Sequence, residues 1–199
     1  LDQVDKKTTA EVKHLEISDL PDEEVLVDIT YSSLNYKDGM AVTGTGKIVR
    51  DFPMVPGIDF AGTVSESASE RYQSGDEVIL TGWSVGERYW GGYSQKQKVR
   101  ADWLVPMPDG LDARKAMTIG TAGLTAMLCV MTLEEAGVKP DSGKVLVTGA
   151  AGGVGSISVL LLSQLGYEVT AVTGRADTHD YLASLGASEF ISREEMAAV

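Results

Sequence analysis

Residues 145–155, with the sequence VLVTGAAGGVG, constrain the fold more than any other stretch of this chain. A short apolar strand pattern runs into a glycine-rich turn, and a helical pattern follows from Ser156. Glycines remove Cβ atoms that would block a ligand, and the first N–H groups of the helix point into the turn. This order predicts a turn that holds the pyrophosphate of a dinucleotide, although an ordinary α/β domain can also contain a strand-to-helix turn.

The next predicted strand, residues 168–173, indicates which dinucleotide is bound. An NAD-preferring fold has Asp or Glu at the end of this strand, where the carboxylate binds ribose hydroxyls and repels a 2′-phosphate. Here the strand ends in Thr173, Gly174 and Arg175. A guanidinium offers paired donors and a fixed positive charge, so the sequence favours NADPH over NADH. Arg175 as a plain surface residue is the alternative, and Asp177 is the nearest acid that weakens the argument.

The pattern of predicted elements changes near residue 112, which predicts two domains at 1–112 and 113–199. The first is rich in short strand patterns separated by turns, at 25–31, 62–65, 77–80 and 92–99. The second begins with a helix at 113–133, broken near Gly120 and Gly123, and continues as strand 144–148, helix 156–165, strand 168–173, helix 178–185 and strand 189–191. The fold class is therefore α/β, with a β-rich barrel domain followed by a Rossmann-type parallel sheet.

Only three strands of the parallel sheet are present, which is half of a doubly wound sheet. A half-sheet leaves an open edge and exposed apolar faces. We therefore expect the chain to be part of a longer protein; a three-stranded domain completed by a partner is the alternative.

The composition limits the partners of the chain. Its formal net charge of −12 disfavours nucleic acid and anionic membranes. No apolar run reaches the length of a membrane span, which predicts no membrane partner. Cys129, the single cysteine, lies in an apolar run and is expected to be a buried thiol in a core helix. This cysteine usage fits a reducing compartment, so we expect a cytoplasmic location.

Several segments together resemble the medium-chain dehydrogenase/reductase superfamily, and within it the zinc-independent, quinone oxidoreductase-like branch that includes the bacterial acrylyl-CoA reductases. The resemblance covers the chain from about Pro21 onward. Besides the glycine turn and Thr173–Arg175, the segments are SSLNYKD at 32–38, VPGIDFAGTV at 55–64, LTGWSVGE at 80–87, WGGY at 90–93 and IGTAGLTAM at 119–127. This resemblance implies a GroES-like fold for the β-rich domain.

The resemblance also bears on metal chemistry. Zinc-dependent alcohol dehydrogenases of the superfamily take catalytic ligands from a Cys and a Gly-His-Glu motif. Here Asn35 stands at the position of the Cys, and Ile58 and Asp59 replace His-Glu. An amide and an isoleucine cannot rebuild a thiolate–imidazole site, so we expect no metal. Reduction of a C=C bond conjugated to a carbonyl then fits better than alcohol oxidation, because hydride addition gives an enolate that a proton completes.

The resemblance assigns roles to particular residues. Tyr36 is expected against the nicotinamide, although it could also pack between the domains. Asn35 and Asp59 are the candidate catalytic residues, which either orient the substrate carbonyl and relay a proton or bond only to each other and to nearby backbone. The expected cofactor contacts are Ala151, Gly152, Gly153 and Val154 at the pyrophosphate, and Thr173, Gly174 and Arg175 at the 2′-phosphate.

Three functions follow from these residues. The first is NADPH-dependent reduction of acrylyl-CoA, or a similar small enoyl-CoA, to propionyl-CoA. The second is NADPH-dependent reduction of a quinone or enone, which keeps the cofactor site and changes the acceptor. The third is a non-catalytic NADPH-binding module or an inactive fragment. The resemblance further implies a homodimer for the full-length protein.

Overall fold

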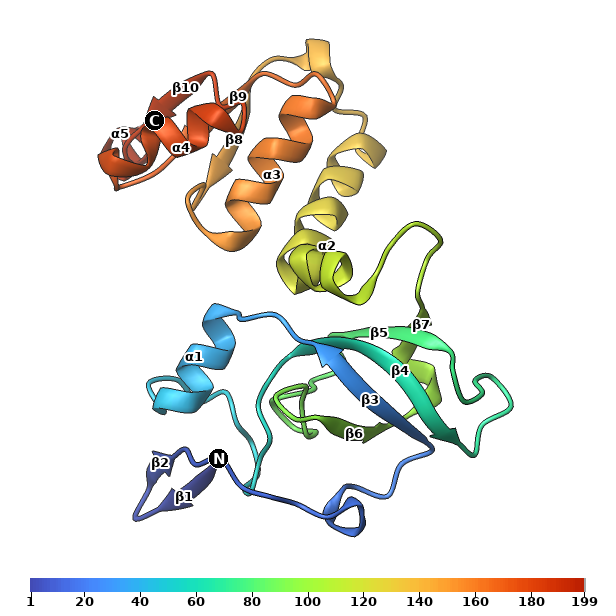
Figure 1. Cartoon of the computed structure of the whole chain (residues 1–199). Helices are drawn as coiled ribbons and strands as arrows, with labels where there is room; N and C mark the ends of the chain where they lie inside the picture. The colour runs from blue at the N-terminus through green and yellow to red at the C-terminus, as the bar shows by residue number, and fades with distance from the viewer. Residues whose placement is uncertain (199) are drawn as a thin grey trace. The chain divides into compact units, whose positions relative to one another are not determined.

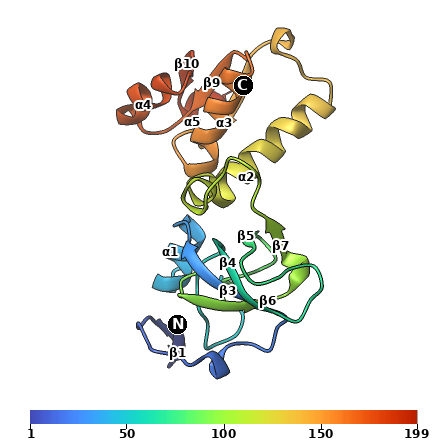
Figure 2. The same cartoon turned by 45° about the vertical axis from the view of Figure 1, so that its right-hand side comes forward.

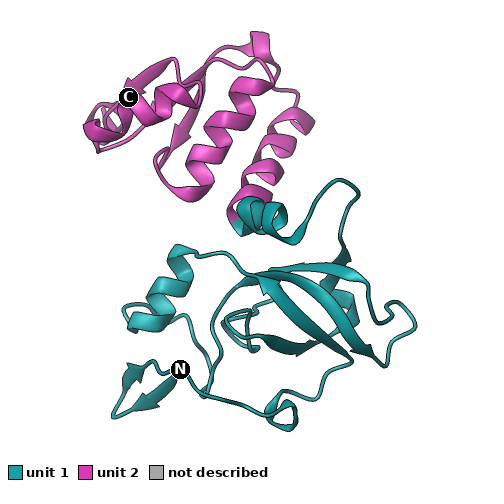
Figure 3. Ribbon diagram, viewed as in Figure 1, with its two compact units in different colours: residues 1–121 teal, residues 122–199 magenta. Residues whose placement is uncertain are grey.

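The computed structural model describes residues 1–198 and divides into two compact units, residues 1–121 and 122–199 (Figure 3). The division falls inside a long helix, α2 (Ala113–Glu135), one residue after a kink at Gly120. The boundary predicted after residue 112 lies just before this helix.

A five-stranded antiparallel sheet forms the centre of unit 1 (Figures 1 and 2). Its core side chains alternate along the strands, and include Val25, Val27, Phe60, Val78 and Leu80. This alternation is what a sheet with one buried face requires. In spatial order the strands are β6 (Lys96–Val99), β3 (Val25–Tyr31), β4 (Asp59–Ser67), β5 (Glu77–Thr81) and β7 (Leu104–Pro106).

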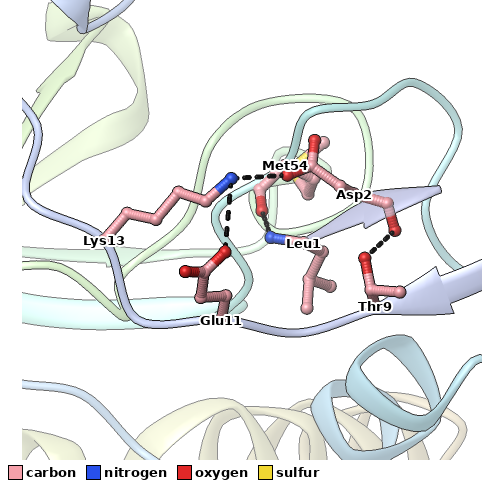
Figure 4. A network of polar contacts seen from close by, with 6 residues as sticks. All are labelled: Leu1, Asp2, Thr9, Glu11, Lys13 and Met54. Atoms are coloured by element: carbon pink, nitrogen blue, oxygen red, sulfur yellow. Dashed lines mark hydrogen bonds and ion pairs between the residues drawn. The ribbon is translucent and has the colours of Figure 1, made fainter. Parts of the chain in front are cut away.

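A hairpin of β1 (Asp2–Val4) and β2 (Lys7–Thr9) precedes this sheet. Its turn residues, Asp5 and Lys6, both have positive φ, as a two-residue hairpin turn requires. Figure 4 shows how the hairpin is held: the Leu1 amine donates to the Met54 carbonyl, and Lys13 pairs with Asp2 and with Glu11. The contact with Lys13 lowers the pKa of Asp2.

Short helices complete unit 1. The helix α1 (Tyr36–Thr43) follows β3, ends at Gly44 in the left-handed conformation and contacts β2. Single 3-10 turns are η1 (Ile17–Asp19) and η2 (Ala101–Trp103).

The helix α2 is apolar and bent. Gly120 has φ 53° and ψ −162°, so the helix stops there and restarts at Thr121. By length and composition α2 qualifies as a possible membrane span, contrary to the expectation that no apolar run is long enough. The kink divides it into pieces of 113–119 and 121–135, each shorter than the roughly 20 residues that a span needs.

Unit 2 is built on a three-stranded parallel sheet in the order β10 (Glu189–Ile191), β9 (Val169–Val172) and β8 (Val145–Thr148). The helix α3 (Gly153–Gln164) packs on β8 and β9. The core consists mainly of aliphatic side chains from the sheet, α2 and α3, among them Val130, Val147, Val159, Leu162 and Val169. The remaining elements are η3 (Pro140–Ser142), η4 (Ala176–Thr178), α4 (His179–Ser184) and α5 (Arg193–Ala197).

The predicted α/β fold class is confirmed, with the first half of a Rossmann-type sheet in unit 2. The strand predicted at 92–99 is shorter in the structure and begins at Lys96. Residues 91–93 instead form a loop, in which the amides of Gly92 and Tyr93 donate to the carbonyls of Gly57 and Pro56 at 2.9 Å. The expected burial of Cys129 was wrong, because this thiol is exposed on α2.

Candidate active site

A fully buried carboxylate, Asp59, is the centre of a polar cluster in unit 1. Asp59 is the first residue of β4, and Ser33 follows β3, which pairs with β4. Asp59 Oδ1 accepts hydrogen bonds from the backbone N (2.9 Å) and Oγ (2.8 Å) of Ser33. Asp59 Oδ2 accepts from Thr121 N at 2.9 Å and from Thr121 Oγ1 at 2.7 Å. These donors satisfy both oxygens of the buried carboxylate.

Asn35 lies at the edge of this cluster and is half-buried. Its Nδ2 donates to Ser33 Oγ at 3.0 Å and lies 3.5 Å from Asp59 Oδ2, a long contact. The structure therefore brings together the two residues predicted to be catalytic. Their roles in catalysis stay a prediction.

A second buried carboxylate, Asp38, fixes the start of α1. Its Oδ2 accepts from Asn35 N at 3.0 Å, and its Oδ1 accepts from the amides of Gly57 and Ile58 at 3.2 and 3.1 Å. Asp38 thereby ties Asn35 to the loop that leads into Asp59. Burial, and next the negative charge of Asp38, raise the pKa of the Tyr93 phenol, so this side chain stays neutral at physiological pH.

Tyr36 is 85% exposed on the first turn of α1. It borders an open hollow of about 510 Å³. The other lining residues are Leu34, Asn35, Gly39, Met40, Thr43 and Thr45. An exposed aromatic ring beside the polar Asn35 leaves space for a planar ligand over α1.

The glycine turn lies at the carboxyl end of β8, where ligands bind in open α/β sheets. Gly152 N donates to Gly149 O at 2.8 Å, and α3 starts at Gly153. A Cβ at Gly155 would lie 2.3 Å from Gly149 O, so only glycine allows the turn to close this tightly. Ala151, Gly152, Gly153 and Val154 are at least partly exposed at the start of α3. This cradle, together with the free N–H groups of a 12-residue helix, fits a pyrophosphate.

Residues 173–175 follow β9 beside this turn. Arg175 and Gly174 are exposed, and Arg175 Nη2 donates to Ala151 O at 3.4 Å. Thr173 is only 7% exposed, and its hydroxyl accepts from Arg175 N and contacts Thr178 Oγ1. The structure thus brings Arg175 to the predicted pyrophosphate site, while the Thr173 hydroxyl lies inside the turn.

Sequence reasoning missed three residues with polar contacts at these sites, Ser33, Asp38 and Thr121, and also Arg193, which lies against Gly174. Ser33 and Asp38 lie in the segment SSLNYKD at 32–38, whose resemblance to the family could have identified them. Thr121 is 62 residues from Asp59 in sequence, and no local pattern connects the two.

The structure describes residues 1–198. Among them, no group of three or more His, Cys, Asp or Glu residues is placed to hold a metal ion. Asp59 occupies one of the positions at which zinc-dependent relatives carry a zinc ligand. Both of its carboxylate oxygens accept hydrogen bonds from protein N–H and O–H groups.

Comparisons with known proteins agree with this geometry. Residues 21–109 match the alcohol dehydrogenase GroES-like domain. The acrylyl-CoA reductase AcuI of Ruegeria pomeroyi is 60% identical over 98% of this chain and 59% of its own length. The yhdH oxidoreductase of Salmonella enterica, solved in complex with NADP, is 60% identical with a TM-score of 0.95, covering 98% of this chain and 60% of the solved one.

A third relative differs in its ligand. The Bacillus subtilis protein yhfP, solved with NAD bound, is 48% identical with a TM-score of 0.93, covering 98% of this chain and 59% of the solved one. The chain spans about 60% of the length of these relatives. It contains an alcohol dehydrogenase GroES-like domain, and along nearly its whole length it is similar to acrylyl-CoA reductases and quinone oxidoreductase-like proteins of the medium-chain dehydrogenase/reductase superfamily, as the sequence predicted.

Proposed function

We propose that the protein is an NADPH-dependent reductase of the C=C bond of acrylyl-CoA or a similar small enoyl-CoA. The observation that carries this proposal is the pairing of a glycine cradle, closed at Gly155, with a guanidinium, Arg175, at the same edge of the sheet. The names of the relatives support the acceptor, since a reductase of acrylyl-CoA is 60% identical to this chain.

The cofactor site divides between two parts of unit 2. The backbone of residues 151–154 would hold the pyrophosphate through the first amides of α3, and Gly174 and Arg175 would hold the 2′-phosphate. When bound, NADPH supplies a hydride, which an enoyl thioester accepts at its β-carbon. The relative from Bacillus subtilis was solved with NAD, so the assay compares NADPH with NADH on this chain.

We assign the acceptor site to the Asp59 cluster and to Tyr36. Asn35 Nδ2 donates one hydrogen to Ser33 Oγ at 3.0 Å, whereas its contact with Asp59 Oδ2 is long, at 3.5 Å. The second hydrogen on this nitrogen is therefore available to the thioester carbonyl. Negative charge develops on that oxygen as the enolate forms, and a positioned N–H stabilises it. Asp59 holds Ser33 and Asn35 in place, and the exposed ring of Tyr36 would contact the nicotinamide. No metal is needed for this chemistry.

Reduction of a quinone or enone is the second candidate. It requires the same cofactor site, and quinone oxidoreductase homologues are among the relatives, such as the protein from spinach that is 31% identical over 92% of this chain. A non-catalytic NADPH-binding module is the third. We further propose a cytoplasmic location, no nucleic-acid or membrane partner, and a homodimer for the full-length protein; the net charge of −12 supports only the exclusion of nucleic acid and anionic membranes.

The test is consumption of NADPH by the purified chain with acrylyl-CoA, run beside a small quinone and beside NADH. The proposal expects turnover of acrylyl-CoA with NADPH at least about 10-fold faster than turnover of the quinone. Faster turnover of the quinone would favour the second function. Binding of NADPH without turnover of either acceptor would favour the third.

A further inference from the structure

The carboxyl ends of β9 and β10 place a second arginine beside the predicted 2′-phosphate site. The two strands are parallel, with Ile191 opposite Val172, and Thr173 N donates to Ile191 O at 3.2 Å. Arg193, two residues after β10, therefore lies next to residues 173–175, which follow β9.

The side chain of Arg193 lies against Gly174. A Cβ at Gly174 would lie 3.7 Å from Arg193 Nε and 4.0 Å from its Cζ. Arg193 is an exposed residue, and so is Arg175, which follows Gly174. Arg193 therefore lies against the exposed Gly174, and Arg175 follows this glycine directly, at the edge of the sheet where ligands bind.

The two arginines lie in an acidic unit. Unit 2 contains nine Asp and Glu residues and only four Lys and Arg residues. Lys144 is paired with Glu168 and Glu189. Within residues 1–198, neither Arg175 nor Arg193 forms an ion pair. Two unpaired cations together in so acidic a unit indicate a negatively charged ligand.

The Glu195 carboxylate of α5 is engaged in a helix cap. Glu195 Oε2 accepts from Ser192 N at 2.6 Å, and Glu195 N donates to Ser192 Oγ at 3.0 Å. This reciprocal cap fixes the start of α5 and keeps the Glu195 carboxylate at the backbone of Ser192. Arg193 therefore remains available for a ligand.

We propose that Arg193 is a specificity-determining residue that binds the 2′-phosphate of NADPH together with Arg175. The inference rests on the proposed function, because it assumes that unit 2 binds this cofactor. Arg193 would also supply a hydrogen-bond donor to the phosphate in place of Thr173, because the Thr173 hydroxyl makes its hydrogen bonds within its own turn. A phosphate monoester carries close to two negative charges at pH 7, and guanidinium groups bind it in a bidentate manner.

The experiment is calorimetric titration of the full chain with four ligands: NADPH, NADH, adenosine 2′,5′-bisphosphate and 5′-AMP. The variants are Arg193→Gln and Arg193→Lys. Lys139→Gln is the matched control, because it removes one exposed positive charge from unit 2 just before η3, which precedes β8. Circular dichroism at 222 nm checks that each variant is folded.

We expect Arg193→Gln to weaken the binding of NADPH and of the 2′,5′-bisphosphate by about 10- to 100-fold, because a charge-assisted hydrogen bond is lost. NADH and 5′-AMP should change by less than about 2-fold, and Lys139→Gln should leave all four affinities unchanged. Arg193→Lys should recover part of the lost affinity, because lysine restores the positive charge but not the paired donors of a guanidinium.

Two results would overturn the inference while leaving the proposed function intact. In the first, the Arg193→Gln variant binds NADPH as tightly as the parent chain. In the second, it loses affinity for NADPH and for NADH by the same factor. A parent chain that binds neither NADPH nor the 2′,5′-bisphosphate would overturn both.

Discussion

Asp59 caps the second half of α2 from outside the helix: Thr121 donates to its Oδ2 with the backbone N at 2.9 Å and with Oγ1 at 2.7 Å. The helix restarts at Thr121 because Gly120 has left the helical conformation, and the first amides of a helix need acceptors. A carboxylate at this end also complements the helix dipole. The same side chain that holds Ser33 and Asn35 thus holds the restart of α2.

Replacement of Asp59 by Asn should destabilise unit 1 by about 2–4 kcal/mol, because one acceptor oxygen becomes a donor that faces other donors in a buried site. All three tryptophans, at positions 83, 90 and 103, lie in unit 1, so the urea midpoint followed by tryptophan fluorescence reports on it. Asp28→Asn is the control, since it breaks only the half-exposed pair with Lys96 and should cost less than about 1 kcal/mol. Equal losses would contradict the capping role.

Gly155→Ala should disrupt unit 2, whereas Gly153→Ala should not. A Cβ at Gly155 would lie 2.3 Å from Gly149 O, a distance that only movement of the turn can relieve. At Gly153 the nearest contact would be the Ala122 Cβ at 3.4 Å, an ordinary van der Waals distance. Amide hydrogen exchange in β8 and α3 measures the effect. Unchanged protection in the Gly155 variant would show that the turn is not as tight as described.

Asn35→Ala should lower kcat for acrylyl-CoA by about 10²- to 10³-fold, the usual effect of removing a donor to a developing oxyanion. The affinity for NADPH should remain within about 2-fold, because Asn35 belongs to unit 1 and the cradle belongs to unit 2. Steady-state kinetics and calorimetry together separate the two effects. A variant with normal kcat would show that Asn35 has only a structural role.

The pKa of Glu189 is lowered, first by its hydrogen bond with Lys144 and then by that with Thr170. A lowered pKa in the folded state means that the contact stabilises the fold above the unfolded pKa and is lost as the pH falls through the folded value. Lys144→Gln should therefore move the Glu189 pKa back toward its ordinary value, as measured by carbon-13 NMR titration of the carboxyl. An unshifted titration in this variant would show that Thr170 alone sets the pKa.

The sequence predicted the parallel sheet well, because its strands and helices are marked by local patterns and by glycines at 149–155, 166 and 186. It also placed Asn35 and Asp59 at one site, through the resemblance. It could not foresee the exposure of Cys129, because an apolar run in a helix does not reveal which face is covered. The Thr121 cap and the approach of Arg193 to Gly174 depend on tertiary contacts between distant segments, and no local pattern encodes them.

The central claim is hydride transfer to the β-carbon of a small enoyl thioester. The most direct test is incubation of the chain with acrylyl-CoA and NADPH deuterated at the transferable C4 position of the nicotinamide, followed by mass spectrometry and NMR of the thioester. The account predicts propionyl-CoA with one deuterium at C3 and none at C2. Propionyl-CoA without deuterium, or recovery of unchanged acrylyl-CoA from a chain that binds NADPH, would contradict it.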